Sequence, residues 1–330
     1  MKKLILGIFV SIIFIYFSVR GVELDNVLTA FKKSNHIFLL PTILMFLLVS
    51  LLRSLRWGVI LSPIEKISQR KLFPIVCVGQ MGVTLIPMRI GEFVRPYLVN
   101  TETKIPLSTA LATVLVERLF DMLTIIGILF FVTFNSALPD WLVKSGHASL
   151  VAVAVLLVFV LLLCFKPEYI IKLFMLLLKI FPLKYQVRFE GIIHNFAEGF
   201  KIISSPKRLV YILFLSLSVW GCFGSGIYAL FYFSGFQLSP AAALIVMVCT
   251  VIGVSLPAAP GMMGNFHYAS IVALIFLGIQ KSDALTFSMI FYFLAIGKNI
   301  LLGLICLPLV NFSFKDIKKR FNLVQVMDHD

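Results

Sequence analysis

Three ionisable side chains lie inside one long apolar run of the sequence. The run covers residues 107–134 and carries Glu117, Arg118 and Asp121 near its middle. In a helix, Glu117 and Asp121 lie one turn apart on one face, with Arg118 beside them. Each such group costs between about 2.5 and about 17 kcal/mol when it faces lipid. We therefore expect them to face protein or water, either as a substrate site or as a structural ion pair.

A second group of charges lies in the sequence IPMRIGEFVRPYLV, where a proline and a glycine interrupt an apolar stretch. Arg89, Glu92 and Arg95 follow one another at intervals of three, which places them on one face of a helix. The planar guanidinium group suits phosphate, and Glu92 could hold an arginine in place or carry a proton. The alternative is that these arginines only extend to the inner membrane interface.

A third candidate is the sequence LPAAPGMMGNFHYA, in which helix breakers precede a new helix. The N-terminus of a helix attracts anions, and Asn265 and His267 would add to this one. A structural role for His267 is the alternative. The breakers that we include in the candidate site are Pro260, Gly261 and Gly264.

Lys298 is a further buried cation, inside the last apolar run of the chain. We expect it to neutralise Glu117 or Asp121, as a structural partner or as part of the mechanism.

The composition identifies a membrane protein. The 330 residues are 60% hydrophobic and only 13% charged, with a mean hydropathy of +1.02, well above the apolar share of soluble domains. The net charge of +14 indicates anionic lipid headgroups at the cytoplasmic face as partners, and not nucleic acid. The five cysteines are scattered singly, so they predict neither a disulfide framework nor a metal site.

Catalytic motifs are absent from the sequence. It has no HExxH, GxSxG, Walker loop or GxGxxG with a following strand. We therefore predict no catalytic residue, metal or cofactor, and a transporter is favoured over an enzyme.

The elements that position the charged groups are predicted to be helices throughout. About six runs are close to the length of a membrane span; they cover residues 4–19, 37–52, 107–134, 148–165, 209–233 and 284–310. The excess of Lys and Arg in inner loops places both termini in the cytoplasm. It also places Arg53, Arg56, Lys66, Arg70 and Lys71 in an inner loop.

Two shorter apolar stretches must then enter the membrane and return on the same side. Residues 72–100 would enter from the inside and residues 241–279 from the outside, as two re-entrant hairpins of opposite entry. Such an inverted repeat is typical of transporters, and broken backbone at this depth must face protein or water. We expect the two tips to meet near the midplane.

The predicted organisation is one all-α membrane domain, residues 1–330, in the cell (inner) membrane. Its parts are a first half, 1–134; a cytoplasmic amphipathic segment, 166–208; a second half, 209–310; and a basic cytoplasmic tail, 311–330.

The three motifs RIGEFVRPYL, VERLFD and LPAAPGMMGNFHYA together resemble the flippase-like family that includes the membrane region of lysylphosphatidylglycerol synthases. The resemblance implies handling of a phospholipid or lipid-linked substrate, including movement of its headgroup between leaflets. Many relatives have a glutamate in place of His267 and a second glycine after the Pro-Gly pair. The resemblance does not extend to the soluble aminoacyl-transfer domain of the fused synthases, so no lysyltransferase activity is expected of this chain unaided.

The sequence leads to one main hypothesis and two alternatives. The main one is a lipid translocase that binds a phospholipid or lipid-linked phosphate headgroup in a polar cavity at the midplane. The first alternative is an intramembrane lipid-modifying enzyme, or an accessory subunit of one, acting in phosphatidylglycerol aminoacylation or glycolipid synthesis. The second is a scaffold or regulator without a substrate. The lipid, the direction and energy source of transport and the oligomeric state stay open.

Overall fold

The structure is a computed structural model, and it describes most of the predicted membrane domain. The described residues are 34–86, 91–135, 151, 154–155, 191, 195–196, 198–200, 205–256 and 260–310. Within them all regular structure is helical, as predicted. The predicted span 4–19, most of the predicted span 148–165, most of the segment 166–208 and the tail 311–330 lie outside the described residues.

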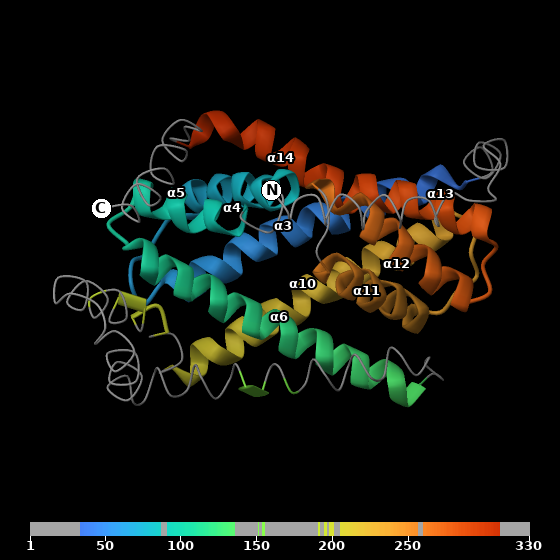
Figure 1. Cartoon of the computed structure of the whole chain (residues 1–330), viewed down its shortest axis with the longest axis horizontal. Helices are drawn as coiled ribbons and strands as arrows, with labels where there is room; N and C mark the ends of the chain where they lie inside the picture. Colours follow the sequence, from blue (N-terminus) through green and yellow to red (C-terminus); the bar gives the residue numbers. More distant parts are fainter. Residues whose placement is uncertain are drawn as a thin grey trace, which may run out of the picture.

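Long helices run along the longest dimension of the molecule (Figure 1). They are α3 (Leu39–Leu61), α6 (Leu107–Asn135), α10 (Pro206–Phe233) and a continuous helix formed by α13 (Lys281–Tyr292), the π-helical turn η5 (Phe293–Gly297) and α14 (Lys298–Cys306). Short 3-10 turns, η1 (His36–Phe38) and η6 (Leu307–Leu309), precede α3 and follow α14. Among the described residues, His36–Leu61, Pro206–Phe233 and Lys281–Leu309 are long and apolar enough to cross a membrane. The chain is a polytopic membrane protein.

The first described span is longer than the sequence analysis predicted. The prediction ended it at residue 52, before Arg53, whereas α3 continues to Leu61. Trp57 and Ile60 are fully buried, so the apolar face of the helix continues beyond the two arginines. Arg53 and Arg56 therefore lie inside a helix and not in an inner loop.

The range 72–100 contains a helical hairpin. Its helices are α4 (Gln69–Leu85) and α5 (Val94–Glu102). At the open end, the Lys71 Nζ donates to the Glu102 carbonyl oxygen at 2.9 Å. Near the tip, Gly82 and Gly91 bring the two backbones together, and a Cβ on Gly91 would overlap the backbone of Gly82. The close crossing thus depends on glycine.

The range 241–279 contains a second pair of helices, α11 (Pro240–Ser255) and α12 (Met263–Phe276), joined through the turn η4 (Pro260–Met262). In η4, Gly261 has a φ of 78°, a conformation that favours glycine. The Asn265 side-chain amide donates to the carbonyl oxygens of Gly253 at 3.2 Å and Leu256 at 3.3 Å. Asn265 thereby satisfies carbonyl groups at the end of α11 that would otherwise lack partners.

The turn of the second helical pair contacts the first pair. Helix α4 contacts η4, and the Tyr292 hydroxyl of α13 donates to the Gly261 carbonyl oxygen at 2.7 Å. Figure 1 shows α4 and α5 toward one end of the long axis, and α11 and α12 toward the other. Helix α12 of the second pair packs against α13, and α4 of the first pair packs along α14, so the last long helix contacts both pairs.

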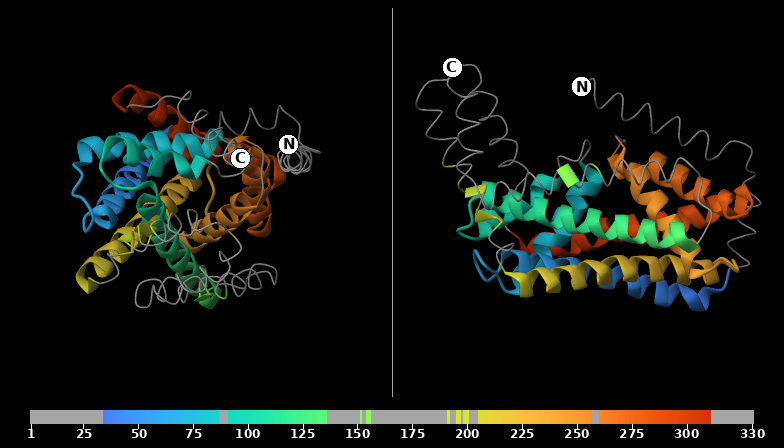
Figure 2. Two further views of the ribbon diagram at one scale, coloured as in Figure 1. Left: turned by 60° about the vertical axis from the view of Figure 1, so that its left-hand side comes forward. Right: turned by 90° about the horizontal axis from the view of Figure 1, so that it is seen from below.

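The order of elements repeats along the chain: a long helix, a helical pair and another long helix. The two first helices, α3 and α10, pack against each other, and α6 contacts α10, which it crosses at an angle in the left view of Figure 2. One apolar cluster surrounds α11, α12 and α13, including Phe266, Phe287 and Phe291. The other surrounds α4, α5 and the first half of α6, including Trp57 and Leu98. The polar residues described below lie largely between these clusters.

Part of the predicted amphipathic segment contacts the start of α6. The Thr109 hydroxyl donates to the Asn195 carbonyl oxygen at 2.7 Å, and Phe200 is buried in the cluster around α6. Gly199 allows this approach, since a Cβ there would overlap Ala112.

The Gly82–Gly91 crossing gives a prediction about stability. Gly91→Ala forces two backbones apart, so it should lower the free energy of unfolding by about 1–3 kcal/mol. Gly221→Ala in α10 is the matched control, because a Cβ there meets nothing within 4 Å. It should be neutral or stabilising. Thermal unfolding of the two variants in detergent measures the difference, and equal melting temperatures would contradict the close crossing.

Candidate functional site

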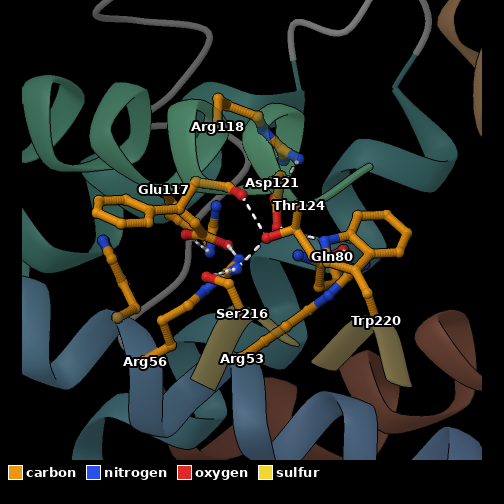
Figure 3. Close-up of polar contacts among 12 residues, drawn as sticks. Arg53, Arg56, Gln80, Glu117, Arg118, Asp121, Thr124, Ser216 and Trp220 are labelled. Carbon is orange, nitrogen blue, oxygen red and sulfur yellow. Dashed lines mark hydrogen bonds and ion pairs between the residues drawn. The ribbon is translucent and has the colours of Figure 1, made fainter. Parts of the chain in front are cut away.

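Arg56 is the centre of a buried ion-pair network. Its Nη2 lies 3.0 Å from Glu117 Oε1 and its Nη1 lies 2.7 Å from Asp121 Oδ1. The two carboxylates are four residues apart on α6, so one forked guanidinium group on α3 reaches both (Figure 3). The Arg56 side chain is 0% exposed. Its Nη1 also donates to the Ser216 hydroxyl on α10 at 2.8 Å.

Glu117 is shared between two arginines. While Oε1 accepts from Arg56, Oε2 accepts from Arg95 Nη1 at 2.9 Å. Arg95 comes from α5, where its stem fits against Gly79 of α4; a Cβ on Gly79 would overlap it. The Arg95 guanidinium also lies 5.0 Å from the centre of the Trp57 ring, a distance at which cation–π attraction operates. Glu117 thus joins α3, α5 and α6.

Asp121 connects the network to α10. Its Oδ1 accepts from Arg56 and also from the Trp220 indole Nε1 at 3.0 Å. Its Oδ2 accepts from Arg118 Nη1 at 3.5 Å. Four long or hairpin helices, α3, α5, α6 and α10, therefore meet through side chains that bind Glu117 or Asp121.

The outer edge of the network is Arg118 with Glu92. The Arg118 Nε lies 3.8 Å from Glu92 Oε2. These side chains are 31% and 28% exposed, whereas Arg95 and Glu117 are each 1% exposed. In total, three arginines face three carboxylates, so the network carries no net charge when all six groups are ionised.

Two further cations among the described residues, Arg53 and Lys298, have neutral hydrogen-bond partners. The Arg53 Nη1 donates to Gln80 Oε1 at 3.2 Å. The Lys298 Nζ donates to Ser50 Oγ at 3.0 Å and to Asn299 Oδ1 at 2.8 Å. The sequence analysis expected Lys298 to neutralise Glu117 or Asp121, and the structure gives those carboxylates to arginines instead.

The residues predicted around the second hairpin form a separate group. The His267 Nδ1 lies 2.7 Å from Ser288 Oγ, which lies 2.7 Å from Ser270 Oγ. Asn265 and Gly264 are buried, and Gly261 accepts from Tyr292. Pro260 begins the turn η4. Among the described hydrogen bonds, none joins these residues to the arginine network, so the predicted site divides into two parts.

One residue of the predicted site is not described by the structure, and several partners of the acids were not predicted. Arg89 lies outside the described residues. The sequence analysis missed Arg56, Ser216 and Trp220 as partners of the acids. A signal for Arg56 was present, because apolar residues continue after it to Leu61. Nothing in the sequence distinguished Ser216 or Trp220 from other residues of an apolar helix.

Comparison with known proteins gives the family. Residues 4–303 match the lysylphosphatidylglycerol synthase transmembrane region. The chain belongs to this family. It is 24% identical over 230 residues to a UPF0104 membrane protein of Methanocaldococcus jannaschii, covering 69% of this chain and 93% of that protein. A second UPF0104 membrane protein, from Methanothermobacter thermautotrophicus, is 26% identical over 273 residues, covering 77% of this chain and 79% of that protein.

A shorter similarity concerns an enzyme. The glycosyltransferase AglD of Haloferax volcanii is 40% identical over 53 residues, which cover 16% of this chain and 8% of AglD. No solved structure matches the chain significantly. Family membership therefore rests on sequence, and it agrees with the resemblance drawn from the three motifs.

The possible metal-binding groups and the cysteines of the described residues also bear on the chemistry of the site. Within the described part of the chain, no group of three His, Cys, Asp or Glu side chains could hold a metal ion. The four described cysteines, Cys77, Cys222, Cys249 and Cys306, are free thiols. What these helices present to one another is a set of fixed charges and hydrogen-bonding groups that could bind a polar group.

The network predicts an order of stabilities. Arg56→Leu leaves Glu117 and Asp121 short of a partner, so it should lower the free energy of unfolding by about 3–5 kcal/mol. Arg118→Leu is the matched control, since Arg118 is partly exposed and its contacts are longer; it should cost no more than about 1 kcal/mol.

Adding Glu117→Gln and Asp121→Asn to Arg56→Leu should recover part of the lost stability, because the uncompensated charges are removed. Thermal and denaturant unfolding in detergent give the comparison. A larger loss for Arg118→Leu than for Arg56→Leu would show that the network is not organised around Arg56.

Proposed function

We propose that this protein is a flippase-like lipid translocase, which binds a phospholipid or lipid-linked phosphate at bilayer depth and moves its headgroup between leaflets. The observation that carries the proposal is the closed network of three arginines and three carboxylates inside a membrane domain. Buried ion pairs are often no more stabilising than apolar residues of similar volume. Stability alone therefore gives little reason to keep six charged groups there, and ionisable residues in membrane segments usually mark a pathway.

The backbone supports the same proposal. The turn η4 of the second helical pair is in contact with α4 of the first. Polar backbone groups at membrane depth are tolerated where they face protein or water. The turn at the first tip also carries Glu92, which pairs with the partly exposed Arg118. A polar region of this kind could receive a headgroup while the acyl chains stay in the lipid.

Family membership is consistent with a role in lipid handling, since the family is defined by the membrane region of a synthase of lysylphosphatidylglycerol. We place the protein in the cell membrane with both termini in the cytoplasm. We also propose that the α4–α5 pair enters from the inside and the α11–α12 pair from the outside, as an inverted repeat.

Transport is tested in liposomes. Purified protein should move phosphatidylglycerol with a fluorescent headgroup to the outer leaflet, where dithionite bleaches it, faster than in vesicles without protein. Glu117→Gln should slow the transfer at least about tenfold, a barrier increase of about 1.4 kcal/mol, because the charge shared by Arg56 and Arg95 is lost. Glu65→Gln is the same chemical change outside the network and should leave transport intact. Bleaching equal to that of empty vesicles would remove the translocase proposal.

Topology is tested by thiol labelling. In a chain whose native cysteines are replaced by alanine, Ser68→Cys at the start of α4 should react with an impermeant maleimide only from the inner side. Ser239→Cys at the start of α11 should react only from the outer side. Both serines are exposed, so labelling reports the side and not burial. Labelling of both from one side would exclude opposite entry.

A lipid-modifying enzyme is the second candidate, favoured by the local similarity to the glycosyltransferase AglD. Incubation of the protein with phosphatidylglycerol or polyprenyl phosphate and a nucleotide-sugar donor, followed by lipid mass spectrometry, separates the two. A change in lipid mass would support the enzyme, and movement without a change in mass would support the translocase.

A further inference from the structure

The arginines of the network are already committed to carboxylates. Arg56 and Arg95 are 0% and 1% exposed, and their terminal nitrogens face Glu117 and Asp121. Because the network is neutral as a whole, a phosphate that bound to Arg56 or Arg95 would have to break a buried ion pair and leave a carboxylate without its partner, which is strongly unfavourable. The phosphate site should therefore be sought among cations without an acidic partner.

Arg53 is such a cation. Its Nη1 donates to Gln80, and its guanidinium group lies 6.0 Å from the centre of the Trp220 ring (Figure 3). Among the described residues, no carboxylate lies within 4.0 Å of it. Asp121 attracts it from farther away, but the Asp121 oxygens already accept from Arg56, Trp220 and Arg118. Arg53 is partly exposed, unlike Arg56.

Lys298 is the second. Both acceptors of its Nζ, Ser50 and Asn299, are neutral, and among the described residues it forms no ion pair. It is also partly exposed. Lys298 directly follows the π-helical turn η5, and such turns often occur at functional sites because they re-aim the side chains that follow.

The two cations share one location. Ser50, which Lys298 binds, lies one turn before Arg53 on α3. Gln80, which Arg53 binds, is on α4, and α4 packs along α14, where Lys298 begins. Both positively charged side chains therefore lie at the same stretch of α3. Two like charges in an apolar surrounding are unfavourable until an anion joins them.

We propose that Arg53 and Lys298 form the phosphate-binding pair of this protein, with Gln80, Ser50 and Asn299 as neutral hydrogen-bonding groups around it. The ligand class is a phosphate ester, whose oxygens would accept from the Arg53 fork and from the Lys298 ammonium group. This proposal rests on the proposed function, in which the phosphate belongs to a lipid headgroup. The adjoining network then serves to position α3 and α10, which carry Arg53 and Trp220.

Ligand-induced stabilisation tests the pair without any transport measurement. The full chain in detergent is heated with short-chain phosphatidylglycerol, with inorganic phosphate, or with diacylglycerol of the same chain length. A ligand that binds the folded state raises the melting temperature. The phosphatidylglycerol shift should be present in the wild type and lost in Arg53→Gln and in Lys298→Gln. Arg53→Lys and Lys298→Arg, which keep the charge, should retain part of it.

The same variants carry an internal check on folding. Because neither residue has an acidic partner among the described residues, Arg53→Gln and Lys298→Gln should leave the melting temperature without ligand unchanged or higher, in contrast to Arg56→Leu. Arg70→Gln removes an exposed charge at the start of α4 and should keep the ligand shift. A shift that persists in both neutral variants overturns the proposal, and so does an equal shift with diacylglycerol.

The comparison of inorganic phosphate with phosphatidylglycerol distinguishes a free phosphate from a lipid headgroup as the ligand. A shift with inorganic phosphate as well as with lipid identifies the phosphate group itself as the determinant, and a shift with phosphatidylglycerol alone identifies the lipid headgroup; both support the pair. Failure of this inference differs from failure of the proposed function. If transport survives in Arg53→Gln and Lys298→Gln, the phosphate-binding pair is rejected and the translocase proposal stands. If binding depends on the pair but the protein transports no lipid, the pair stands and the translocase proposal is rejected.

Discussion

One guanidinium group between two carboxylates is the interaction on which the rest of the structure depends. Arg56 reaches Glu117 and Asp121 because these acids lie one turn apart on α6, and Arg56 comes from a different helix. Each of the three would be unfavourable alone in a membrane domain. Their mutual contact fixes the rotation of α3 and α6 about their axes. It also fixes α5 and α10, which supply Arg95, Ser216 and Trp220 as partners of the same three side chains.

The neutrality of the ion-pair network around Arg56 explains how cations beside it can remain available to an anionic ligand. In a protein where every cation at depth had an acidic partner, an anionic ligand would have to compete with carboxylates. Here the described carboxylates of the centre are occupied by Arg56, Arg95 and Arg118. The cations beside them, Arg53 and Lys298, are held by amide and hydroxyl oxygens. Such partners satisfy hydrogen bonds without cancelling charge.

The sequence predicted the class of fold and the kinds of residue at the centre, because both follow from local rules. Long apolar runs require helices in lipid, and acids inside such a run require partners. The identity of the partners did not follow. Arg56 is 65 residues from Asp121, and Lys298 is 248 residues from Ser50, so their pairing is decided by helix packing. The predicted end of α3 was wrong for a local reason. The prediction ended the span at an arginine, whereas buried apolar residues follow that arginine in the same helix.

The contact between α4 and η4 has a mechanical consequence. The turn of the second pair rests against α4 of the first, and the Tyr292 hydroxyl links η4 to the long helix that packs against α12 and α4. If one end of the molecule opened by withdrawal of its hairpin, the opposite hairpin would still close the far side. A continuous water channel would then never form. In the translocase proposed above, this arrangement would keep protons and small ions from leaking across the membrane while a headgroup passed.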